Sequence, residues 1–245
     1  MAFLTPDNVR YENGVKICEK IIPDSAVWNR DVKEGGYTYR KGTTYKANRP
    51  LSVIKGITIH NTGRIKIPNG TTMAEQYTRA TYPNCNMGSV RVHYYVDDVE
   101  GWQNLDESEV GWHAADGNYG PGNSTTIAIE IIMDGTDAEY NRIAEDNGAR
   151  LCAAILKRHG LDATAVYQHH DWYARKDCPA YIRPHWDAFL AAVRQYLSDD
   201  TQVPSDYDKL VAELADLKGQ LQLQHANAQD FRDEILATVA KYETK

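Results

Sequence analysis

Two runs of β-branched and apolar residues lie far apart in this chain and restrict the fold more than any other feature. Residues 54–60 read IKGITIH, and residues 126–132 read TIAIEII. Runs of this kind and length are typical of buried strands. The second run is followed at once by residues 137–158, whose apolar spacing and Asp137 as N-cap predict a long helix. Strands and helices arranged in this way predict an α/β fold.

Shorter elements are expected around these two strands. Three more strands are predicted at residues 91–96, 102–105 and 166–170. Two further helices are predicted at residues 71–82 and 184–197. Thr71 or Thr72 is the expected cap of the first of them, and Pro184 suits the first turn of the second. The glycine-rich residues 111–123 are expected to form a loop.

The ends of the chain differ from its centre. We expect one main domain over residues 1–199, of which residues 1–50 form an irregular lead-in with one short strand near residues 15–22. Residues 200–205 are the expected linker. Residues 206–245 carry an apolar seam at heptad spacing and predict a C-terminal helix. Two interpretations stay open, namely a coiled coil that makes a homodimer and an amphipathic helix lying on the main domain.

Charge and hydropathy exclude several classes of partner. The net charge is −7 and no basic cluster occurs, so no nucleic-acid partner is expected. No apolar run approaches the roughly 20 residues that span a bilayer, so no membrane insertion is expected. Residues 1–14 lack the features of a secretory signal, which predicts a protein made in the cytosol and kept there until something releases it.

A histidine and a second, downstream segment together predict a metal site. His60 ends the first strand, where α/β proteins often place site residues. Residues 168–179 read QHHDWYARKDCP, so a His pair and Cys178 flank a short loop. Two nitrogens and one sulfur suit zinc better than calcium or magnesium, and three protein ligands leave a position open for water. A structural zinc would need a fourth ligand, for which the second His of the pair is the candidate.

Five segments in order carry a resemblance to a known family. They are ITIHNTG (57–63), VHYYVDD (92–98), GWHAADGN (111–118), IAIEI (127–131) and HHDWYARKDCP (169–179). They resemble the type-2 N-acetylmuramoyl-L-alanine amidases, the zinc amidases of phage endolysins and peptidoglycan-recognition proteins. The resemblance implies a mixed central sheet flanked by helices, with one zinc ion in a surface groove. It also implies cleavage of the bond between N-acetylmuramic acid and the L-alanine of the peptidoglycan stem peptide.

The resemblance implies zinc on His60, on one histidine of the pair and on Cys178. The family usually has seven residues between this histidine and the cysteine, and that spacing selects His170. The flanking residues Val166, Asp171 and Trp172 match the family pattern around the ligand histidine only if the ligand is His169. Loop length varies more easily than a strand-end position, so we favour His169. Neighbouring strand residues point to opposite faces, so both can ligate one ion only if the strand has already ended.

The other site residues are also implied by the resemblance. Glu130 interrupts an apolar strand, and a buried carboxylate is costly unless it is paired or functional. A salt-bridged structural role is the alternative to the implied role of general base. Lys176 would stabilise the oxyanion, and Trp112 and His113 would form the wall of the groove. Some family members carry a catalytic Tyr at the position that Val92 occupies here. No such Tyr can be carried over to this chain, so the catalytic interpretation depends more on Glu130.

Two functions of different class remain at this point. Some relatives of this fold bind peptidoglycan without cleaving it, which would make the chain a binding module. The presence together of Cys178, Lys176 and Glu130 favours catalysis. The absence of a secretion signal favours a phage or prophage lysin that acts on the cell wall after release.

Overall fold

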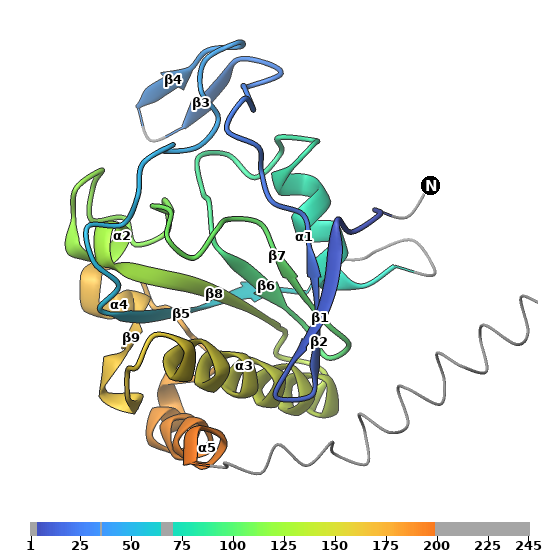
Figure 1. Ribbon diagram of the computed structural model, residues 1–245, viewed down its shortest axis with the longest axis vertical. Coiled ribbons are helices and arrows are strands. Elements are labelled where there is room, and N and C mark those ends of the chain that lie inside the picture. The colour runs from blue at the N-terminus through green and yellow to red at the C-terminus, as the bar shows by residue number, and fades with distance from the viewer. Residues whose placement is uncertain (1–3, 35, 65–70, 199–245) are drawn as a thin grey trace, which may run out of the picture. The chain divides into compact units, whose positions relative to one another are not determined.

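The computed structural model describes residues 4–34, 36–64 and 71–198, and these contain a seven-stranded mixed sheet (Figure 1). The strands, in their order across the sheet, are β1 (Asn8–Glu12), β2 (Val15–Glu19), β7 (Gly101–Gln103), β6 (Tyr94–Val96), β8 (Thr126–Met133), β5 (Gly56–Gly63) and β9 (Val166–Gln168). Strands β1 and β2, and likewise β6 and β7, pair antiparallel, and the other neighbours pair parallel. The predicted α/β fold with a mixed sheet is confirmed.

Strands β5 and β8 are the two runs that the sequence predicts as buried. They pair parallel over their full lengths, and His60 lies opposite Glu130. Alternate side chains of the pair are fully buried isoleucines, including Ile129 and Ile131. A Cβ added at Gly148 would meet the Ile131 side chain at 2.3 Å, so this apolar face lies directly against a helix. Because side chains alternate between the two faces of a strand, β5 and β8 together present one apolar face that packs against a helix.

One long helix covers that apolar face, and a second helix packs against the first. Helix α3 (Ala138–Arg158) begins at Asp137, whose carboxylate accepts from the Tyr140 N–H at 3.0 Å. Helix α5 (Trp186–Ser198) packs beside α3 (Figure 1). It follows a 3-10 turn, η2 (Arg183–His185), so the predicted helix at 184–197 is present with an irregular first turn.

The opposite face of the sheet is more polar and carries shorter helices. They are α1 (Met73–Thr81), α2 (Pro121–Thr125) and α4 (His169–Trp172). Thr72 caps α1 by accepting from the Glu75 N–H at 3.1 Å. The Trp172 indole donates to the Thr58 hydroxyl at 2.9 Å, which ties α4 to this face of β5.

The prediction for residues 1–50 is confirmed for the short strand near residues 15–22, which is β2, but the remainder is not an irregular lead-in. Strands β1 and β2 form a hairpin that joins the main sheet through parallel pairing of β2 with β7. Asn13 and Gly14 both have positive φ, the conformation that tight two-residue hairpin turns require. Strands β3 (Val32–Glu34) and β4 (Tyr37–Tyr39) form a second, two-stranded sheet.

Three smaller boundaries also differ from expectation. The predicted strand at 166–170 ends at Gln168, and His169 begins α4. The predicted loop at 111–123 runs into α2 at Pro121. The linker at 200–205, the helix at 206–245 and the dimer inferred from it lie outside the described residues. Among the helices that are described, none combines the length and apolar character needed to cross a bilayer.

Candidate active site

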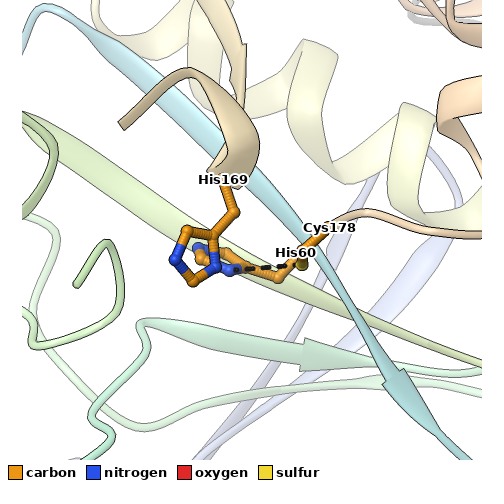
Figure 2. Close-up of side chains that lie close together, drawn as sticks. All are labelled: His60, His169 and Cys178. Carbon is orange, nitrogen blue, oxygen red and sulfur yellow. Dashed lines mark hydrogen bonds between the residues drawn. The ribbon is translucent and has the colours of Figure 1, made fainter. Parts of the chain in front are cut away.

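Three buried side chains meet on the polar face of the sheet (Figure 2). His60 comes from β5, His169 is the first residue of α4, and Cys178 lies in the loop that follows. At most 3% of any of them is exposed. Their potential ligand atoms all lie within 4.8 Å of one another, and Cys178 Sγ is 3.9 Å from His60 Nδ1. The three residues therefore form a group that could hold a metal ion.

The structure brings His169, rather than His170, into this group. The strand has ended at Gln168, so the two histidines already lie on a helix. The His170 N–H donates to the Cys178 carbonyl at 2.9 Å, and its Nδ1 lies 3.1 Å from the Lys176 carbonyl. His170 thus fastens the loop that carries Cys178 and Lys176.

The donor set fits zinc. Both ring nitrogens of His169 are buried and have no hydrogen-bond partner among the described residues, although buried polar atoms are normally paired. Tetrahedral zinc bonds of about 2.0 Å to nitrogen and 2.3 Å to sulfur would place the two ligand atoms roughly 3.5 Å apart. The observed 3.9 Å between Cys178 Sγ and His60 Nδ1 is close to that separation.

The pKa values in the group also suit a metal. Burial raises the pKa of the Cys178 thiol to about 11, and the Glu130 charge raises it further, while the Asn61 N–H and Lys176 lower it. A nearby dication would be needed to hold this thiol as a thiolate. Burial lowers the pKa of His169 to about 4, and Lys176 lowers it too, while the Ala114 backbone raises it. The histidine is therefore in the neutral form that binds metals.

Glu130 lies opposite His60 in the β5–β8 pair. The residue as a whole is partly buried, but its Oε2 is shielded from solvent and has no hydrogen-bond partner among the described residues. Burial raises the pKa of Glu130 to about 7, and the positive charge of Lys176 lowers it. A carboxyl with a pKa near neutrality can both accept and return a proton. No ion pair of the kind expected for a structural Glu is found at Glu130 within the described ranges.

Lys176 is exposed, in the loop between α4 and Cys178. Burial is the largest influence on the pKa of His60, of His169 and of Glu130, and the Lys176 charge lowers all three. One ammonium group thus acts electrostatically on the whole site. Such a fixed cation is suited to stabilise negative charge that develops beside it.

Trp112 and His113, predicted as groove-wall residues, lie differently from each other. Trp112 is partly buried, whereas His113 is only 5% exposed. His113 Nδ1 lies 3.1 Å from His60 Nε2, a contact that the sequence does not suggest. Burial lowers the pKa of His113 well below its usual value, as do His93 and His169, while the Thr126 backbone raises it.

Two further residues near the site carry no recognisable sequence signal. Asn123 accepts hydrogen bonds from the backbone of His113 and of Ala114, both at 2.8 Å. Tyr77 from α1 stacks on Tyr95, and its pKa is raised by burial and by the charge of Glu130. Both residues lie in segments whose pattern predicts only local structure, so nothing in the sequence connects them with His60 or Glu130.

Fold and site together define the class of protein. A mixed sheet presents a buried His, His and Cys group with no fourth protein ligand among the described residues, beside an unpaired carboxylate. Three ligands with an open position are the arrangement of a catalytic rather than a structural metal site.

Comparison with known proteins gives the family. The family described as N-acetylmuramoyl-L-alanine amidase matches residues 49–181. The N-acetylmuramoyl-L-alanine amidase CwlH of Bacillus subtilis (strain 168) is 31% identical over 178 residues, which cover 70% of this chain and 68% of CwlH. XlyA, an amidase of the same organism, is 34% identical over 137 residues, or 56% of this chain and 43% of XlyA. The chain thus spans about two thirds of CwlH and less than half of XlyA.

The fold agrees with this comparison. The solved catalytic domain of XlyA superposes with a TM-score of 0.57 at 27% identity, and the match covers 73% of this chain and 99% of that domain. The chain belongs to the N-acetylmuramoyl-L-alanine amidase family.

Proposed function

We propose that this chain is a zinc-dependent hydrolase of bacterial peptidoglycan that cleaves the amide bond between N-acetylmuramic acid and L-alanine. The observation that carries the proposal is the buried group of His60, His169 and Cys178 beside the unpaired Glu130 carboxylate. CwlH and XlyA are both named as amidases of this kind, which supports the same bond as the target. The similarity to a solved mutant endolysin from Bacillus subtilis, at 29% identity and a TM-score of 0.55, supports a role in lysis of a host cell wall.

His60, His169 and Cys178 would hold the zinc ion. When bound, zinc supplies Lewis-acid chemistry, so that water becomes a competent nucleophile near neutral pH and a carbonyl is polarised. The burial of the group limits the contact of these three side chains with bulk solvent. Cys178 is the residue that distinguishes this set from a purely histidine site, because its thiolate also offsets one charge of the ion.

Glu130 is proposed as the general base and Lys176 as the electrostatic partner. The shielded Oε2 of Glu130 accepts the proton of the attacking water and returns it to the departing alanine nitrogen. The water oxygen bonds to the carbonyl carbon of the lactyl group, and the bond between that carbon and the alanine nitrogen breaks. The products are a carboxylate on the lactyl group and a free alanine amine. Lys176 stabilises the negative charge on the carbonyl oxygen during attack.

Digestion of purified peptidoglycan tests this function. The expected products carry a new N-terminal alanine amine and no new reducing sugar end, as identified by mass spectrometry. Activity should disappear with a chelator and return with zinc. Release of reducing ends, or full activity after the metal is removed, would reject the assignment.

We also propose, from the heptad spacing of residues 207–242 alone, that the C-terminal segment makes a homodimer. Two catalytic domains on one wall surface would raise avidity. Light scattering on the full chain should give twice the monomer mass, and on a chain ending at Asp199 the monomer mass. A monomeric full chain at micromolar concentration would reject the dimer.

A further inference from the structure

The ring of His60 has two nitrogens that face different partners. Its Nδ1 lies 3.9 Å from Cys178 Sγ and therefore faces the proposed metal group. Its Nε2 lies 3.1 Å from Nδ1 of His113, and the two rings meet edge-on at an interplanar angle of 89°. His113 is thus the only hydrogen-bond partner of His60 Nε2 among the described residues.

This geometry fixes where the protons lie. A metal-binding nitrogen must be free of a proton, so the single proton of the His60 ring belongs on Nε2. Only one proton fits between the two facing nitrogens, so His113 Nδ1 must accept it. The proton of His113 then lies on Nε2, a buried atom with no hydrogen-bond partner among the described residues.

His113 is itself held firmly. The Asn123 side-chain oxygen accepts from the backbone N–H groups of both His113 and Ala114 at 2.8 Å, and its amide donates to the Gly117 carbonyl at 3.0 Å. Asn123 is only 4% exposed. A Cβ at Gly111 would lie 3.0 Å from the His113 ring and 2.7 Å from the Arg91 carbonyl, so the ring is also packed from behind.

We propose that His113 is a positioning residue that sets the tautomer and orientation of His60, and that Asn123 holds His113 in place. The inference rests on the proposed metal site. It departs from the expectation that His113 is a wall of the substrate groove, because the ring is buried against His60.

Zinc affinity is the readout that separates positioning from substrate binding. Changes to residues that orient metal ligands typically weaken metal binding by about 10–100-fold. A groove-wall residue would change KM and leave zinc affinity as it is. Two pairs of variants are informative, and in each pair one variant keeps an acceptor atom and the other removes it.

The first pair is His113→Leu and His113→Asn. Leucine removes the acceptor, whereas the asparagine oxygen lies close to where Nδ1 was. The second pair is Asn123→Ala and Asn123→Asp, of which only the aspartate can still accept from both backbone N–H groups. Zinc affinity is measured on the full chain by competition with a chromophoric chelator, and the visible spectrum of the cobalt-loaded protein reports the ligand geometry.

We expect His113→Leu and Asn123→Ala to weaken zinc binding about 10–100-fold and to shift the cobalt spectrum, and His113→Asn and Asn123→Asp to recover most of the affinity. His93→Leu is the control, because His93 is buried nearby and bonds only to the backbone of Glu109 and Ala128 within the described ranges. It should lower the melting temperature of the metal-free protein and leave the zinc affinity unchanged.

The outcomes separate this inference from the proposed function. If the wild type binds zinc and His113→Leu binds it equally well with the same cobalt spectrum, the positioning role is wrong and the metal site stands. If His93→Leu weakens zinc binding as much as His113→Leu, the effect is general destabilisation and the inference is also wrong. If the wild type binds no zinc, both fail.

Discussion

The two faces of the β5–β8 pair are made by the same two strands and have opposite properties. The face toward α3 is lined by fully buried isoleucines. The face toward α4 carries His60, Glu130 and Thr58, together with buried side-chain atoms of His169 and Glu130 that have no hydrogen-bond partner in the described part of the chain. Side chains alternate between the two faces of each strand. As a result, one face stabilises the fold and the other presents polar groups that are available for catalysis.

The largest expected effect is loss of the metal through Cys178→Ser. Removing a ligand should weaken zinc binding beyond the roughly 10–100-fold that outer residues give, and hydrolysis should fall with it. The matched control is Cys152→Ser, the same change at a fully buried residue of α3, on the apolar side. Chelator competition and activity are measured on both. Equal zinc affinity in Cys178→Ser and the wild type would mean that Cys178 is not a ligand.

The next effect is on catalysis without loss of metal. Glu130→Gln should lower kcat by about 10²–10⁴-fold, because the amide cannot take a proton from water. Zinc content and melting temperature should stay near wild type, since Glu130 Oε2 has no hydrogen-bond partner to lose among the residues that the structure describes. A loss of less than about tenfold would remove Glu130 from the role of general base.

A substitution on the apolar face should lower stability and leave metal binding unchanged. Ile129 is fully buried, and Ile129→Ala should lower the free energy of unfolding by about 2–5 kcal/mol through lost burial and a cavity. The zinc affinity of the folded protein should not change. Denaturant unfolding and chelator competition measure the two quantities. If zinc binding weakened in proportion to stability, the two faces would not be independent.

The smallest effect is expected at Glu107, far from the metal group. Burial alone would raise the pKa of Glu107, but hydrogen bonds from Tyr94, Arg158 and His159 lower it. A lowered pKa means that this stabilisation is present above about pH 4.3 and is lost as the pH falls through the folded-state pKa. Glu107→Gln should therefore cost about 1–3 kcal/mol at pH 7 and progressively less below pH 4.

Unfolding of Glu107→Gln and the wild type at several pH values checks this. A cost that stays constant from pH 7 to pH 3 would show that the Glu107 charge does not matter. The variant is also the matched control for Glu130→Gln, because the same chemical change should here affect stability and leave kcat unchanged.

The spacing of apolar residues along the sequence predicted the strands and helices that bury one face. Strands β5 and β8 and helix α3 were found because burial on one face imposes a period on the sequence. The β1–β2 hairpin was missed as a hairpin although Asn13 and Gly14 give its turn signal. Its place beside β7 was beyond prediction, because residues 84 positions apart pair there, such as Ile17 with Gly101, and neither strand's own sequence specifies its neighbour.

The site divides in a similar way. His60, Cys178 and the His pair were found because their residue types and spacing suit a metal, and three-dimensional placement was needed to bring His169 rather than His170 into the group. The contact of His113 with His60 and the two bonds accepted by Asn123 were not predictable. They join loop residues to a strand by tertiary packing, which leaves no periodic trace in the sequence.

The central claim is that the polar face holds one zinc ion on three protein ligands. Anomalous diffraction from crystals of the full chain, recorded on both sides of the zinc absorption edge, tests it most directly. The account predicts a single peak within bonding distance of His60, His169 and Cys178, with no fourth protein ligand. The absence of a peak at these residues would contradict it, as would a zinc ion that is coordinated by a fourth protein side chain.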